Sequence, residues 1–126
     1  MTTALLVIAH GSRNAEANGD LHHAVAQLRE RGEYAVVEPA FLELAEPAIE
    51  DAGARCVATG VRRVILLPYF LSAGVHVRED LRAHRQRLAE RFPDVSFVVA
   101  EPISRHPALI DIVAGRAREA ERKMDT

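Results

Sequence analysis

The sequence predicts an α/β fold in which a parallel sheet is covered by helices on both faces. Apolar runs of strand length alternate four times with stretches of helical periodicity, the pattern of successive βα units. The run at residues 63–70 shows no polar alternation from Val64 to Leu67, as expected of a strand buried on both faces. No long loop or low-complexity stretch interrupts the chain, so residues 1–126 are expected to form one domain.

Each unit contributes one strand, and the strands are expected at residues 4–9, 34–41, 63–70 and 95–100. The second strand is interrupted late by Pro39. Because proline cannot donate a hydrogen bond to a neighbouring strand, this strand is expected at an edge of the sheet or to carry a bulge.

Helices are expected to begin near Asn14, at Pro47, just after His76 and at Pro107. The second should turn Cys56 inward as a core residue. In the third, Glu79 and Asp80 should fall in the first turn, where the helix dipole favours acidic groups, and His84 should pack partly buried. The fourth should turn Ile110, Val113 and Ala117 inward, and the polar tail at residues 118–126 should fray.

The connections between the strands limit the possible sheet topologies. Right-handed crossovers and short loops favour the strand order 2-1-3-4, a flavodoxin-like arrangement. Strands one and three are then neighbours whose crossovers leave in opposite directions, and ligands bind in the crevice that opens at such a switch point.

Composition excludes several classes of function. With 16 basic and 18 acidic residues, the chain has no basic field for nucleic acid. The single cysteine excludes an internal disulfide and fits a reducing compartment. The first three residues lack a basic signal region, and residues 4–9 are too short to cross a membrane. We therefore expect a cytoplasmic protein that binds neither nucleic acid nor membrane.

Three potential metal ligands follow three different strands. His10 ends the first strand, Glu43 comes just after the second, and His76 lies beyond the third. Since the carboxyl ends of parallel strands share one edge, these residues are expected at one mouth, where imidazole suits iron, cobalt, nickel or zinc. Residues 71–75 carry no bulky charged side chain, so backbone can approach a ligand closely there.

Four stretches carry a resemblance to a known family: LLVIAHGSR at 5–13, FLELAEPAI at 41–49, LPYFLSAGVHVREDL at 67–81 and EPISRHPAL at 101–109. Together they resemble the small sirohydrochlorin chelatases of the CbiX and SirB type, which are class II tetrapyrrole chelatases. The resemblance implies a chelatase-like domain that inserts cobalt or ferrous iron into sirohydrochlorin, for cobalamin or sirohaem synthesis.

The resemblance also implies roles for individual residues. His10 and His76 match the metal-binding pair, His10 matches the proton acceptor, and Glu43 matches an acidic partner. The loop that binds the macrocycle matches Leu71, Ser72, Ala73, Gly74, Val75 and His76. The resemblance further implies that no cofactor is permanently bound, because the divalent metal (cobalt, iron or nickel) is a substrate.

Two further expectations concern the substrate and the assembly. The carboxylate arms of the macrocycle favour arginine, and the candidates near the rim are Arg13, Arg78 and Arg105. A four-stranded sheet offers one wall for so broad a ligand, and larger class II chelatases resemble two such units fused, so a homodimer is expected.

Two alternatives stay open. A histidine phosphatase-like enzyme would also place a His-Gly pair after the first strand, but its motif has arginine directly before the histidine, and here that residue is Ala9. A non-catalytic metal or tetrapyrrole carrier would use the same ligands without turnover.

Overall fold

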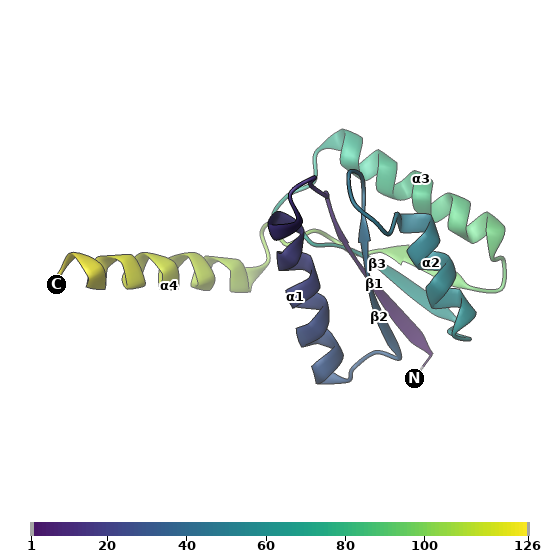
Figure 1. Cartoon of the computed structure of the whole chain (residues 1–126), viewed down its shortest axis with the longest axis horizontal. Coiled ribbons are helices and arrows are strands. Elements are labelled where there is room, and N and C mark those ends of the chain that lie inside the picture. The colour runs from purple at the N-terminus through teal and green to yellow at the C-terminus, as the bar shows by residue number, and fades with distance from the viewer. Residues whose placement is uncertain (1, 126) are drawn as a thin grey trace.

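The computed structural model describes residues 2–125 and has four strands that alternate with four helices (Figure 1). The elements are β1 (Thr3–Ala9), α1 (Ala15–Arg31), β2 (Val36–Phe41), α2 (Ile49–Ala58), β3 (Arg63–Pro68), α3 (Val75–Arg91), β4 (Ser96–Val99) and α4 (Pro107–Met124).

The sheet has the predicted order, β2-β1-β3-β4, and every pairing is parallel. β2 is an edge strand, which confirms the interpretation of Pro39. Because β1 and β3 are neighbours, the predicted switch point lies between their carboxyl ends.

Helices lie on both faces of the sheet, as predicted, and they divide the core in two. Ala4, Leu6 and Ile8 point toward α2 and α3, and Leu5 and Val7 point toward α1. The alternation follows from the two-residue repeat of a strand. β1 is therefore buried on both faces and holds the two halves of the core together.

The larger half of the core contains the inward surfaces of α2 and α3. Cys56 has no exposed surface, which confirms it as a core residue. Burial, and secondarily the Glu38 carboxylate, raises the pKa of its thiol to about 12. His84 is partly buried, as predicted, with its Nδ1 atom 3.2 Å from a carboxylate oxygen of Glu50. It therefore joins α3 to α2.

The helix α4 departs from the prediction. It leaves the domain after β4 and extends away from the sheet (Figure 1). None of its residues is buried, so the expectation that Ile110, Val113 and Ala117 face inward is wrong. The helix continues through the predicted tail to Met124. The predicted apolar residues do lie along one side of α4, but no part of the described domain covers them.

Among residues 2–125, no helix combines the length and the apolar character that crossing a bilayer requires.

Candidate functional site

The rim at the carboxyl ends of the strands is built around His10. β2 runs on beside the first loop, so that the amide of Leu42 donates to the carbonyl of Ala9 and the amide of Glu43 donates to the carbonyl of His10, both at 3.0 Å. The backbone thereby places Glu43 directly beside His10. Both side chains are exposed to solvent.

Gly11 makes this close approach possible. Its φ is +96°, and a Cβ atom there would overlap the carbonyl oxygen of Glu43 and lie 2.9 Å from its carbonyl carbon. Only glycine adopts this conformation without steric cost and leaves room for the neighbouring backbone. The close approach of the Glu43 backbone therefore requires glycine at position 11.

The loop after His10 is held by Asn18, a residue that the sequence analysis did not single out. Asn18 accepts a hydrogen bond from the amide of Ser12 at 2.9 Å and donates one to the carbonyl of Ser12 at 2.8 Å. Asn14 caps α1 by accepting from the amide of Glu16 at 2.9 Å. These bonds tie the loop to the first turns of α1.

The imidazole of His10 lies against the loop that follows β3. Its ring centroid is 4.4 Å from that of Phe70, and the two planes are inclined by 35°. The amide of Tyr69 donates to the carbonyl of Ile8 and fixes the start of the same loop. His10 is therefore positioned between the segment that carries Glu43 and the segment that leads to His76.

His76 is the second residue of α3, because the helix begins at Val75. The helix therefore starts two residues earlier than predicted, and Glu79 and Asp80 fall beyond its first turn. The cap residue is Gly74, which has no side chain to mark the helix start in the sequence. His76 is exposed at the rim.

In the described part of the chain, no three His, Cys, Asp or Glu residues form a group that could hold a metal ion. His10, Glu43 and His76 share the rim but do not form a preassembled three-ligand centre. The assignment of His10 and His76 as a metal-binding pair stays a prediction.

The rim also exposes an apolar band, which we define as Leu44, Tyr69, Leu71 and Val75. Their exposed fractions are 53%, 38%, 63% and 70%. These residues come from the β2–α2 loop, the β3–α3 loop and the start of α3. All four follow the carboxyl ends of β2 and β3, and large apolar side chains exposed at that edge are candidates for contact with a ligand. Leu71 and Val75 belong to the loop expected to bind a ligand, whereas no feature of the sequence indicated Leu44 and Tyr69.

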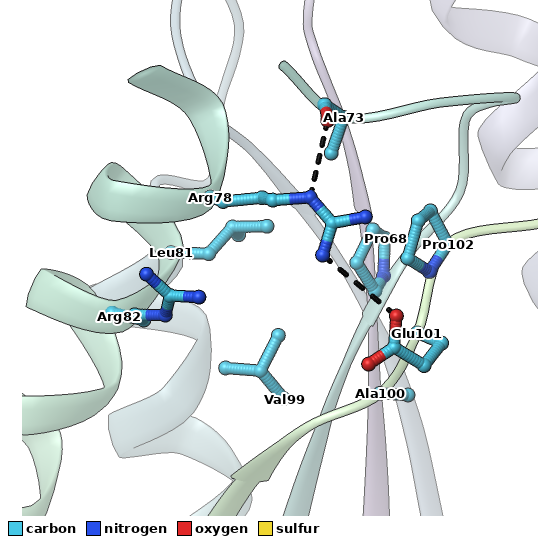
Figure 2. Close-up of a pocket in the computed structure, with 9 residues that line it drawn as sticks. All are labelled: Pro68, Ala73, Arg78, Leu81, Arg82, Val99, Ala100, Glu101 and Pro102. Carbon is cyan, nitrogen blue, oxygen red and sulfur yellow. Dashed lines mark hydrogen bonds and ion pairs between the residues drawn. The ribbon is translucent and has the colours of Figure 1, made fainter. Parts of the chain in front are cut away.

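Two hollows lie next to the β3–α3 loop, and Arg78, Glu101 and Pro102 line both of them. A small cavity of about 100 Å³ lies between α3 and the end of β4, and there Arg78 donates to the carbonyl of Ala73 at 3.2 Å and lies 3.7 Å from a carboxylate oxygen of Glu101 (Figure 2). A wider hollow of about 620 Å³ is lined by Ser72, Arg78, Glu101, Pro102, Ser104, Arg105 and His106. It brings together Arg78 and Arg105, two of the three predicted carboxylate ligands.

Comparison with known proteins agrees with this arrangement. The CbiX family matches residues 4–120. The chain belongs to the CbiX family. Two solved structures share its fold. A CbiX protein from Marinobacter aquaeolei VT8 superposes with a TM-score of 0.84 at 28% sequence identity, and the match covers 96% of this chain and 98% of that one. The sirohydrochlorin chelatase SirB from Bacillus subtilis subspecies spizizenii, in complex with cobalt, superposes with a TM-score of 0.86 at 28% identity, and the match covers 94% of this chain and 51% of that one.

Among curated relatives, the chloroplastic sirohydrochlorin ferrochelatase of Arabidopsis thaliana is 38% identical over 112 residues, which cover 89% of this chain and 50% of that protein. The chain thus spans about half the length of this relative and of SirB, but nearly the whole Marinobacter protein.

Proposed function

We propose that this CbiX family chain is a sirohydrochlorin chelatase that inserts cobalt or ferrous iron into the macrocycle, for cobalamin or sirohaem synthesis. The observation that carries the proposal is the rim itself. An exposed imidazole, His10, stands beside a carboxylate, Glu43, and next to an exposed apolar band. Proton transfer, metal binding and the docking of a flat ring are the three tasks of a chelatase.

In the proposed reaction a divalent metal replaces two pyrrole N–H protons, and both protons must leave the ring. Neutral His10 has a lone pair that can hold the metal or, once the metal has passed to the ring nitrogens, accept a proton. Glu43, which follows His10 through the backbone contact of the two loops, relays that proton to solvent, and His10 is then free to accept the second proton. His76 acts with His10 as a metal ligand. Two imidazoles hold the metal loosely enough for it to be transferred.

The macrocycle would lie on the loop at residues 71–76, with the apolar band against its face. Leu71 and Val75 supply apolar contact, and Gly74 has no atom within 4 Å of the position where a Cβ would stand, so it leaves space at the rim. Arg78 and Arg105 line one hollow and are the proposed partners of the substrate carboxylates. Arg13 does not line this hollow.

We also propose that the working unit is a homodimer. The rim of one chain provides one wall for a broad ligand, whereas relatives of twice the length carry a further region that this chain does not match. A second copy supplies an opposite wall.

Anaerobic incubation of the protein with sirohydrochlorin and Co²⁺, Fe²⁺ or Ni²⁺, followed by absorbance, tests the proposal. Multiple turnovers are expected with at least one metal. The exposed His23 on α1 provides a matched control, because His23→Ala removes an imidazole away from the rim. Binding of ring and metal without turnover would identify a carrier and refute the chelatase proposal.

A further inference from the structure

One face of the sheet is only half covered. α1 packs over β1 and β2, and within residues 2–125 no helix lies over the same face of β3 and β4 (Figure 1). Ile65 and Val98 are register partners on this open face, and Val98 is 57% exposed. A cavity of about 290 Å³ opens there, lined in part by Thr3 and Tyr34. Aliphatic residues on the face of a sheet are normally covered by a second layer of secondary structure.

The helix α4 has a complementary apolar stripe, formed by Ile110, Val113, Ala117, Ala120 and Met124. Spacings of three and four residues place these side chains on one side of a helix. Ile110, Val113 and Met124 are 68%, 54% and 85% exposed. Ile112 lies outside this stripe, roughly 120° around the helix from its centre and on the same side as Arg116 and Glu119, and is 59% exposed.

The connection between β4 and α4 directs the helix away from its own sheet. The amide of Ser104 donates to the carbonyl of Leu71 at 2.6 Å, and Arg105 adopts a left-handed conformation with φ +66°. His106 caps α4 by accepting from the amide of Ala108 at 3.1 Å. For α4 to cover its own β3 and β4, this bonded turn would have to be rebuilt.

We propose that two copies of this chain exchange their α4 helices, so that each helix covers the open β3–β4 face of the other copy. This inference rests on the proposed homodimer and defines its interface. A second copy of the chain covers both the apolar stripe of α4 and the open β3–β4 face. A two-fold axis makes the exchange reciprocal.

The dimensions and charges of the two surfaces fit each other. The 18 residues of α4 span about 27 Å, enough to cross the roughly 20 Å of the six-residue strand β3. The small side chains of Ala117 and Ala120 let the helix approach the branched residues of the face. With the helix antiparallel to the strands, as in a βα unit, Glu121 reaches the end of the sheet where Arg63 lies.

Cross-linking between differently tagged chains tests the exchange. One chain carries Val98→Cys and the other carries Val113→Cys, and the two are co-expressed and treated with a short bismaleimide. We expect covalent dimers that contain one chain of each kind. Cys56 does not interfere, because it is fully buried. Cross-links within a single chain that carries both substitutions, or between two Val113→Cys chains, would overturn the proposal, as would no cross-link at all.

A substitution pair on α4 gives an independent measurement by sedimentation. Val113→Glu should raise the dimer dissociation constant by about 10- to 100-fold, because it places a charge in an apolar contact. Ile112→Glu, at nearly the same exposure but outside the apolar stripe, should change it less than about threefold. Equal effects would overturn the exchange while leaving a dimer in place. A wild-type sedimenting mass of 13.9 kDa instead of twice that value would refute the homodimer itself, and insertion activity would still be tested separately.

Discussion

Replacing Gly11 with alanine tests how closely the backbone of β2 approaches His10. Two costs are expected in Gly11→Ala. The left-handed φ of +96° costs an L-residue about 1–2 kcal/mol. The new Cβ also overlaps the carbonyl oxygen of Glu43, and a backbone atom cannot rotate away as a side chain can. We expect a total loss of about 3–5 kcal/mol in the free energy of unfolding.

Gly60 provides a matched control for the conformational cost. Its φ is +92°, but a Cβ there would have no atom within 4 Å. Gly60→Ala should therefore lose only about 1–2 kcal/mol. Urea denaturation of both variants, compared by midpoint and slope, gives the difference. Equal losses in the two variants would refute the close approach. In the part of the Gly11→Ala protein that still folds, Glu43 must move away from His10, and metal insertion should slow, which it should not in Gly60→Ala.

Three further predictions concern the site and the core. His10→Ala and His76→Ala should each lower metal insertion at limiting metal by about 100-fold or more with the fold retained by circular dichroism, and wild-type rates in either would remove that residue from the mechanism. Gly74→Val should weaken sirohydrochlorin binding, followed by fluorescence, more than metal binding, and unchanged affinity for the ring would place the ring elsewhere. The pKa of the Cys56 thiol rises from 9.0 to about 12 on folding, so its contribution to stability is complete below pH 9 and declines as the pH rises toward 12. Cys56→Ala should show a shallower loss of stability over that interval, and identical pH profiles would contradict the burial of a neutral thiol.

The sheet could be predicted because strand burial leaves a direct mark on the sequence. The unbroken apolar run of β3 and the late Pro39 in β2 determine which strands are central and which lies at an edge. Right-handed crossovers then leave few strand orders. The same reasoning placed His10 and Glu43 at one rim, since both follow parallel strands.

The departures from prediction have physical causes. An apolar stripe shows that a helix face will be covered, but it does not say by what, so Ile110 and Val113 were wrongly assigned to this domain's own core. The start of α3 was misplaced because Gly74 caps it without a side-chain signal. The exposure of Leu44 and Tyr69 depends on how two loops meet, which residue type alone does not indicate.

The hydrogen bond from the amide of Ser104 to the carbonyl of Leu71 joins the two surfaces for which functions are proposed. Leu71 belongs to the loop assigned to the macrocycle, and Ser104 lies in the turn that sets the direction of α4. If binding of the macrocycle moves the loop at residues 71–76, this hydrogen bond transmits the movement to the turn before α4 and changes the orientation of the exchanged helix. Thermodynamic linkage is reciprocal, so any factor by which the ring changes dimer affinity is the factor by which dimerisation changes ring affinity. Substrate affinity in this protein should accordingly depend on protein concentration.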